Sequence, residues 1–232
     1  MIYIGLDDTD IKGSRGTGRL ARTMVGILSE HFNIFGITRH QLLFDPRVPY
    51  TSKNSSATIH LQENGSVNLE ALADRIEALM RSDWFEGSDP GLCVTRDIHP
   101  SMADFGSRVK TELVTQPEAR EVAQASGCIL RGLGGTCDGI IGALASVGLA
   151  ATGNDGRFIL AGSMRDLSGL HRIDSILASG IAEVRSLEGQ VIEEGIVETG
   201  RKLRPALREG RPILFVEQDD TNQKHWVPVK LD

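Results

Sequence analysis

The chain has 232 residues, of which 40% are hydrophobic and 24% charged, and these proportions are ordinary for a globular protein with a core. No run approaches the roughly 18 apolar residues that cross a bilayer, and no basic segment precedes a long apolar one at the N-terminus, so we expect no signal peptide. The net charge of −6 argues against a protein that holds a long nucleic acid unaided, because phosphate neutralisation dominates such binding.

Strand and helix patterns alternate irregularly over the first two thirds of the chain. We predict, in chain order, a strand at 2–6, a helix at 20–32 with Thr17 as its N-cap, strands at 34–44 and 57–62, a helix at 69–80, a strand at 91–95, helices at 118–125 and 140–149, and a strand at 158–162. The strands alternate between polar and apolar residues and lack continuous Val and Ile runs. This pattern favours an α+β fold over a doubly wound parallel sheet.

The pattern changes after about Arg165. A short helical stretch at 173–181 is followed by four strand-like pieces, GIAEVRS, GIVETG, PILFVEQ and HWVPVK. We therefore predict a small, mainly β C-terminal module over residues 166–232.

Three aspartates, Asp7, Asp8 and Asp10, directly follow the first predicted strand. Carboxylates this close repel one another, and Mg²⁺, which prefers carboxylate and water oxygens and is often shared with phosphates, would neutralise them. The alternative is that one or two of them cap a turn or a helix while the others are solvated.

Two glycine-rich segments each precede a predicted helix. In the first, the backbone of Gly13, Ser14 and Gly16 could bind a phosphate at a helix N-terminus, although the segment is not a Walker A loop and could be only a flexible connector. The second segment, residues 132–139, contains four glycines before an apolar helix and could bind phosphate in the same way. Asp138 could instead simply cap that helix.

A loop at residues 47–54 combines Arg47, Lys53, several hydroxyl groups and Pro49, which suits the binding of phosphate, although it could be an ordinary polar loop. The three cysteines form no C-x-x-C pair, so neither a zinc ribbon nor a disulfide framework is supported, and we expect a reducing cytoplasm. Cys137 lacks a recognisable histidine partner, which argues against a nucleophilic role. The six histidines show no metal-ligand spacing.

Taken together, these motifs resemble the catalytic half of the archaeal tRNA(Ile2) 2-agmatinylcytidine synthetase family. The resemblance covers about residues 1–165, and its most specific parts are IGLDDTD at 4–10 and GIIGALASVG at 139–148. That family uses ATP to activate the C2 carbonyl of the wobble cytidine, which agmatine then attacks. The resemblance implies a kinase-like α/β domain that binds ATP and Mg²⁺ at 1–110, a ferredoxin-like α+β region that completes the site at 111–165, and the β module at 166–232.

The resemblance also implies roles for individual residues. Asp7, Asp8 and Asp10 match the acidic motif that serves ATP and Mg²⁺, and Thr17 matches a threonine that can accept phosphate. Lys53 occupies the place of a basic residue in the family's loop. Gly139 and Gly142 match its second glycine-rich segment. The chain shows no counterpart of the OB-fold and zinc ribbon with which the family binds tRNA, which agrees with its acidic composition.

The leading hypothesis is a cytoplasmic, ATP- and Mg²⁺-dependent phosphotransferase or ligase-like enzyme that acts on a small polar molecule or amine, without a membrane partner. A second hypothesis is a tRNA wobble-cytidine-modifying enzyme that binds RNA through a partner or through the C-terminal module, with Arg201, Lys202, Arg204 and Trp226. A third is a nucleotide-binding regulator without catalytic activity.

Overall fold

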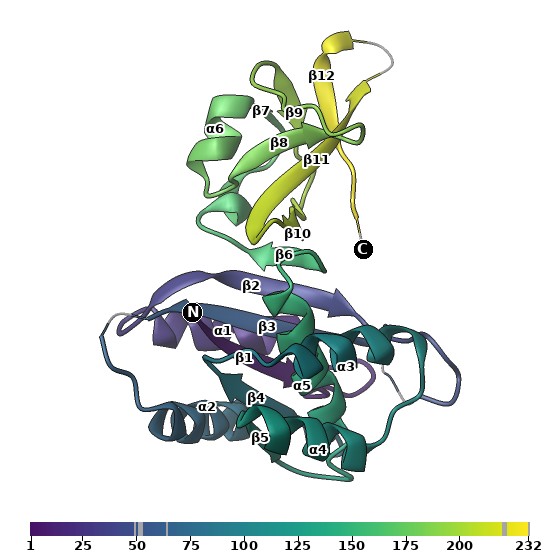
Figure 1. The fold of residues 1–232 in the computed structure, drawn as a ribbon. Coiled ribbons are helices and arrows are strands. Elements are labelled where there is room, and N and C mark those ends of the chain that lie inside the picture. The colour runs from purple at the N-terminus through teal and green to yellow at the C-terminus, as the bar shows by residue number, and fades with distance from the viewer. Residues whose placement is uncertain (49, 51–52, 64, 220–221, 232) are drawn as a thin grey trace. The chain divides into compact units, whose positions relative to one another are not determined.

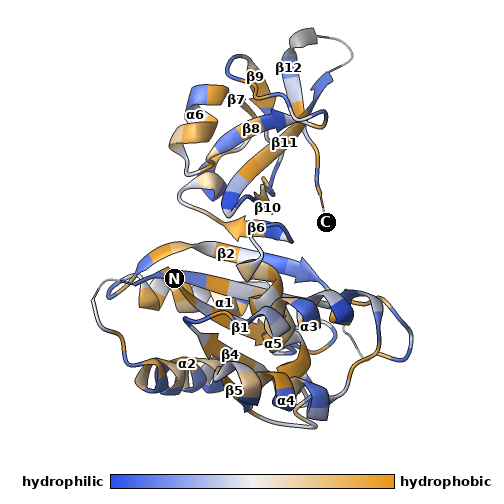
Figure 2. Ribbon diagram, in the orientation of Figure 1, coloured by the Kyte–Doolittle hydropathy of each residue, from blue (hydrophilic) through white to orange (hydrophobic). Residues whose placement is uncertain are grey.

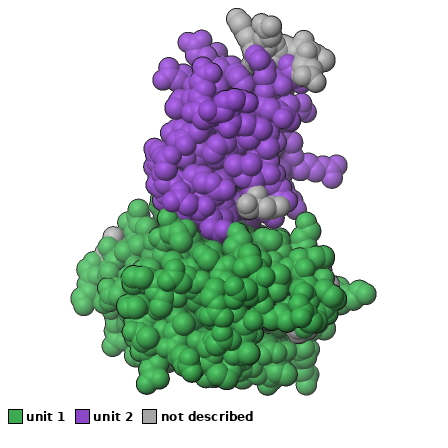
Figure 3. Space-filling model, turned by 45° about the vertical axis from the view of Figure 1, so that its right-hand side comes forward, with its two compact units in different colours: residues 1–152 green, residues 153–232 purple. Residues whose placement is uncertain are grey.

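The structure is a computed structural model that describes residues 1–48, 50, 53–63, 65–219 and 222–231. The chain divides into two compact units, residues 1–152 and residues 153–232, which Figure 3 colours separately. No described helix combines the length and the apolar character needed to cross a membrane.

The first unit is an antiparallel sheet with helices on both faces (Figure 1). Its elements are β1 (Ile2–Asp7), α1 (Thr17–Leu28), β2 (Asn33–Gln41), β3 (Ser55–Gln62), α2 (Leu69–Asp83), β4 (Gly91–Thr95), α3 (Pro100–Thr111), α4 (Gln116–Ser126), β5 (Ile129–Gly132) and α5 (Gly139–Ala151). The strand order is β5-β4-β1-β3-β2, and each neighbouring pair is antiparallel. The combination of an antiparallel sheet with helices confirms the predicted α+β class.

The two faces of the sheet differ in composition because successive side chains of a strand point to opposite sides. On one face, β1 contributes Ile2, Ile4 and Leu6, which are fully buried, and α1 and α2 contact this sheet through their apolar sides. On the other face, β1 contributes Tyr3 and Gly5. Here α5 contacts β1, β3 and β4, and α3 and α4 pack against α5.

Glycines allow α5 to lie very close to the sheet. A Cβ atom added to Gly5 would lie 2.1 Å from the carbonyl oxygen of Ala143, and one added to Gly91 would lie 2.0 Å from the carbonyl carbon of Gly139. Since α5 is buried along nearly its whole length, it consists mainly of apolar and small residues, as Figure 2 shows. The close approach places the first turn of α5 beside the end of β1, where Asp7 lies.

The structure corrects three sequence predictions for this unit. Gly16, not Thr17, is the N-cap of α1, because the hydroxyl of Thr17 bonds to Asp10 instead of to the helix backbone. Helix α3 was missed, although His99 caps it with a hydrogen bond from the backbone N–H of Ser101 and Pro100 occupies its first turn. Strand β5 was also missed, because it is only four residues long.

The second unit, residues 153–232, is mainly β. It contains β6 (Arg157–Leu160), the 3₁₀ turn η1 (Met164–Asp166), β7 (Leu170–Arg172), α6 (Ile173–Ala178), β8 (Glu183–Ser186), β9 (Ile196–Glu198), β10 (Ala206–Arg208), β11 (Arg211–Asp219) and β12 (Asn222–Pro228). Its strands follow the order β6-β10-β11-β12-β9-β7, with β8 parallel to β11. This unit begins at residue 153 and not at the predicted residue 166, because β6 pairs with β10.

Candidate active site

A pocket of about 240 Å³ opens in the first unit and brings together side chains from distant parts of the sequence. Eight of the predicted site residues line it: Asp7, Asp8, Asp10, Thr17, Arg47, Lys53, Gly139 and Gly142. They come from the end of β1, the start of α1, the loop between β2 and β3, and the first turn of α5. Pro49, Thr51 and Ser52, which belong to the same predicted loop, lie outside the described residues.

Asp7, Asp8 and Asp10 form the acidic corner of the pocket, which lies at the end of β1. Asp7 is the last residue of the strand, and Asp8 adopts a left-handed backbone conformation with φ of 49° that turns the chain out of the sheet. Aspartate tolerates this conformation better than most residues with a side chain, and such backbone positions cluster at functional sites. Asp7, Asp8 and Asp10 are all half-buried.

The environment raises the pKa of two of these carboxyl groups. Burial raises the pKa of Asp7 to about 8, and the charges of Asp8 and Asp10 also raise it. Burial likewise raises the pKa of Asp8 to about 6, with further contributions from Asp89, Asp10 and Asp138. Carboxyl groups perturbed by burial and by one another within a pocket are typical of functional sites.

Thr17 is connected to the acidic corner by a chain of hydroxyl groups. The hydroxyl of Thr9 donates to the hydroxyl of Thr17 over 3.1 Å, and Thr17 in turn donates to Oδ1 of Asp10 over 3.1 Å. Both threonines are buried. The Thr17 oxygen therefore faces a carboxylate that can receive its proton. Thr9, which no sequence argument singled out, fixes the position of the Thr17 hydroxyl.

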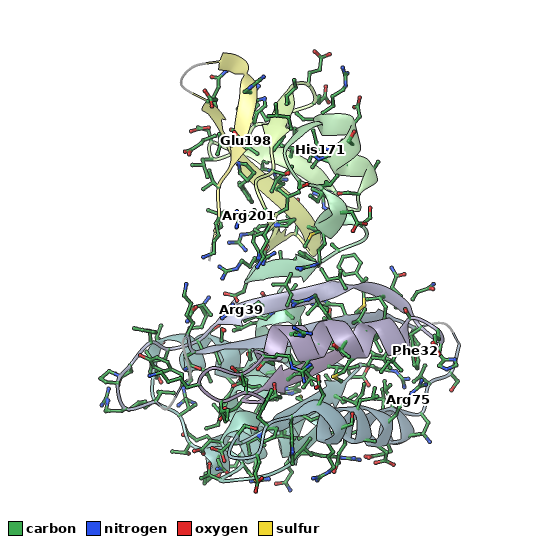
Figure 4. All side chains as sticks on the ribbon, turned by 180° about the vertical axis from the view of Figure 1, so that it is seen from behind. Phe32, Arg39, Arg75, His171, Glu198 and Arg201 are labelled. Carbon is green, nitrogen blue, oxygen red and sulfur yellow. The ribbon has the colours of Figure 1, made fainter. Side chains whose placement is uncertain are left out.

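Two cationic side chains also line the pocket, and a third lies close to the aspartates. Lys53 and Arg47 line the pocket, and Arg47 is held by a bidentate ion pair with Asp45, with N–O distances of 2.8 and 2.7 Å. Arg39, labelled in Figure 4, projects from β2, donates to Ser55 over 2.7 Å and interacts electrostatically with the nearby acidic residues. Arg39 was not predicted as a site residue, because only the sheet register brings it near β1.

The first glycine-rich segment forms hydrogen bonds mainly within its own turn. The backbone N–H of Ile11 donates to the Ser14 hydroxyl over 2.9 Å, and the backbone N–H of Ser14 donates back to Ile11. Gly13 and Ser14 are not among the residues that line the pocket. Gly16 lies nearer, since a Cβ added to it would be 3.8 Å from Oδ2 of Asp10. It begins α1 without a side-chain cap, so the electropositive helix end lies near this carboxylate.

The second glycine-rich segment is shaped by Asp89, another residue that sequence analysis missed. The Asp89 carboxylate accepts the backbone N–H of Thr136, and its carbonyl oxygen accepts the N–H of Gly139 over 3.0 Å. A Cβ added to Gly142 would lie 1.8 Å from Oδ2 of Asp7. Any side chain at residue 142 would therefore clash with the Asp7 carboxylate in its present position. Asp138 occupies the N-cap position of α5 without making a side-chain cap bond.

Asp138 has a partner outside its own helix. Its Oδ1 accepts a hydrogen bond of 2.7 Å from the side chain of Gln116, and the residue lines the pocket. Its carboxylate contributes to the raised pKa of Asp8. Asp138 is therefore a fourth aspartate at this site, and the proposed helix-capping role is not observed.

An apolar wall of the pocket was not predicted. The residues that form it are Leu42, Leu43, Val48, Val109, Leu113, Val114 and Ile141, and the pocket is also lined by the polar residues Asn54, Ser55 and Glu112. Tyr50 also lines the pocket and stacks on the exposed ring of Phe44, with 4.9 Å between ring centroids. The site thus combines charged and apolar lining residues, as pockets for small organic ligands commonly do.

The carboxylates of the pocket fit a magnesium ion that is also bound by a phosphate. Among the described residues, no three Asp, Glu, His or Cys side chains converge as a ready metal site. Mg²⁺ is usually held by only one or two carboxylates together with water and substrate phosphates. The aspartates of the pocket supply such oxygens, so they fit an ion that arrives with a phosphate ligand.

The raised pKa of Asp7 predicts how stability depends on pH. In the folded protein Asp7 releases its proton near pH 8, whereas the ordinary value is 3.8, so the wild type should lose stability as the pH rises from about 5 to about 8. The amide that replaces the carboxyl group in the variant Asp7→Asn cannot ionise. The stability of the variant relative to the wild type should therefore increase over this range and stay constant above it, as urea unfolding without divalent cations would measure.

The titration of His60 does not disturb this comparison. Burial lowers the pKa of His60 to about 3, so His60 makes stability fall as the pH drops below about 6.5. This contribution is the same in the wild type and in Asp7→Asn, and it cancels in the difference. Parallel stability curves for the two proteins would show that Asp7 is already ionised at low pH.

Fold and pocket together define an α+β protein with an acidic site at one end of an antiparallel sheet. No family model and no curated protein sequence matches the chain. Among solved structures, a tRNA fluorescent labeling enzyme is similar, with a TM-score of 0.55 and 20% identity over 63% of this chain and 35% of the enzyme.

Two complexes of TiaS, a tRNAIle2 agmatidine synthetase, are similar as well. The TiaS–tRNA(Ile2)–ATP complex matches with a TM-score of 0.55 and 21% identity, over 63% of this chain and 36% of TiaS. The TiaS–tRNA(Ile2)–AMPCPP–agmatine complex matches with a TM-score of 0.53 and 18% identity, over 63% and 35% of the two chains. The chain thus spans about a third of these proteins, and the resemblance stated from its sequence is confirmed in the fold.

Proposed function

We propose that residues 1–152 bind ATP in the acidic pocket and use it to activate an acceptor, as an ATP- and Mg²⁺-dependent phosphotransferase or ligase-like enzyme. The observation that carries the proposal is the pocket itself, which Asp7, Asp8 and Asp10 line together with Lys53. Solved complexes of similar fold that contain ATP or AMPCPP support the choice of nucleotide. Phosphoryl and nucleotidyl transfer depend mainly on positioning and charge stabilisation, which such a pocket can supply.

The proposal gives each part of the pocket a role. Asp7, Asp8 and Asp10 hold Mg²⁺, which when bound neutralises phosphate charge. Lys53 and the exposed Arg47 bind phosphate oxygens, together with the backbone at Gly16, Gly139 and Gly142, while Gly13 and Ser14 hold the turn that precedes α1. Thr17 either receives a phosphoryl group, with Asp10 taking its proton, or ligates the metal ion. The kinase-like assignment of 1–110 and the ferredoxin-like assignment of 111–165 remain part of this proposal.

The acceptor that we propose is a tRNA. The sequence alone favoured a small polar molecule or amine, but the TiaS complexes of similar fold contain tRNA, and one of them also contains agmatine. An amine can therefore be the second substrate of the same reaction. Because the chain is acidic, RNA would need additional basic surface, for which Arg201 and Lys202 of the second unit are exposed candidates.

Measurement of ATP consumption by the purified chain tests this proposal. The reaction would be followed with and without Mg²⁺, bulk tRNA and agmatine, and AMP or ADP would be identified as the product. We expect turnover that requires Mg²⁺ and rises at least tenfold when tRNA is added, because an acceptor completes the reaction.

The other outcomes separate the alternatives. Turnover that is independent of tRNA but stimulated by an amine would support a small-substrate enzyme. Tight ATP binding without turnover under any of these conditions would support a regulator. Absence of ATP binding, measured by calorimetry with Mg²⁺ present, would contradict the proposed function as a whole.

A further inference from the structure

Two of the three cysteines meet in the core of the first unit. Cys93 lies in the middle of β4, and Cys128 directly precedes β5, the antiparallel neighbour of β4 in which Leu130 is opposite Cys93. Cross-strand neighbours of this kind point to the same face of the sheet. Their sulfur atoms are 3.8 Å apart, with the thiol of Cys93 donating to Sγ of Cys128.

The two thiols have unequal exposure and unequal acidity. Cys93 is fully buried, whereas Cys128 is only half-buried and so keeps partial solvent exposure. The hydrogen bond from Cys93 lowers the pKa of Cys128 to about 7, while the same contact and burial raise the pKa of Cys93. Cys128 is therefore partly thiolate at neutral pH and is the more reactive partner.

The simpler interpretation is that both cysteines only fill space. Cys93 does belong to a core cluster with Phe105 and Ile140, and Cys128 packs at its edge. Two space-filling thiols would not need contact between their sulfur atoms, and neither would they need an accessible partner of lowered pKa beside a buried one. A thiolate that can be attacked from solvent, backed by a second thiol, is the arrangement of a redox-active pair.

We propose that Cys93 and Cys128 form a reversible intramolecular disulfide when the protein meets a peroxide. The Cys128 thiolate attacks the peroxide, gains one oxygen as a sulfenic acid and releases hydroxide. The Cys93 sulfur then displaces that oxygen and forms the S–S bond, so that two thiols and one hydrogen peroxide give one disulfide and two waters. Thiol exchange with a dithiol reductant restores both thiols.

The sulfur atoms are already in contact. Disulfide formation requires them to approach from 3.8 Å to roughly 2 Å. Cys137 lies at the other end of β5, where a Cβ added to Gly132 would be 2.7 Å from its Sγ. It serves as an internal control, and the proposal does not depend on the proposed enzymatic function.

Thiol counting on the full chain tests the pair. The reduced protein is treated with equimolar hydrogen peroxide, unfolded, alkylated and digested. We expect free thiols to fall from three to one per chain, the intact mass to fall by two hydrogen atoms, and one cross-linked peptide pair to contain Cys93 and Cys128. Dithiothreitol should return the count to three.

Two variants make the result decisive. Cys137→Ser should still lose two thiols, whereas Cys128→Ser, which changes a half-buried position and should fold, should lose no pair. A disulfide that includes Cys137, a cross-link between chains, or oxidation of Cys128 to sulfinic acid without a cross-link would each overturn the proposal.

Discussion

Asp8→Asn is expected to reduce ATP consumption by roughly 100-fold or more, because it removes one negative charge from the proposed metal–phosphate site. Asp8 lines the pocket, and its carboxyl is close enough to Asp10, Asp89 and Asp138 for their charges to raise its pKa. Asparagine is preferable to alanine here, since it tolerates the left-handed backbone with φ of 49° and preserves the shape of the side chain. The kcat/KM for ATP at saturating Mg²⁺ would measure the loss.

An exposed aspartate provides the matched control. Asp174, on α6 in the second unit, has a side chain that is 77% exposed and forms a 3.7 Å ion pair with Arg172, so Asp174→Asn should leave turnover unchanged. If Asp8 acts through Mg²⁺, its variant should also require a higher Mg²⁺ concentration for half-maximal rate. Wild-type turnover by a correctly folded Asp8→Asn protein would exclude Asp8 from the site.

The regular part of the fold could be predicted because its signals are local. Apolar spacing predicted α2 within three residues of its observed end, and the alternating pattern predicted β3. Helix α3 was missed because its local signals are weak. A histidine, which is an uncommon cap, begins it, and its sequence contains Gly106. That glycine is needed for packing, because a Cβ there would lie 2.8 Å from the Ala145 carbonyl oxygen.

The candidate site could be predicted only as separate motifs. Asp7, Thr17, Lys53 and Gly142 each belong to a recognisable segment, and the pocket that joins them depends on sheet order and on the close approach of α5. Asp89 has no motif of its own, because its importance comes from contacts with the backbone of a loop more than forty residues away. The apolar wall of the pocket could not be predicted either, because its residue types are the same as those of the hydrophobic core.

The largest effect on stability is expected at Gly91, where β4 and α5 almost touch. A Cβ added to Gly91 would lie 2.0 Å from the carbonyl carbon and 2.1 Å from the carbonyl oxygen of Gly139. These are backbone atoms, so no side chain can rotate away, and the helix or the strand must move. We expect Gly91→Ala to lower the free energy of unfolding by about 3 kcal/mol or more, near the upper end for an overpacked core.

The same substitution at Gly26 should have the opposite sign. Gly26 is exposed within α1, and a Cβ there would meet no atom within 4 Å, so Gly26→Ala should stabilise the protein by about 0.5–1 kcal/mol through helix propensity. Urea unfolding measures both variants against the wild type. Because α5 also holds Gly142 against Asp7, a displaced α5 in Gly91→Ala should weaken ATP binding as well. Equal stability of the two variants would mean that α5 can withdraw from the sheet at little cost, and the position of Asp7 would then not depend on this contact.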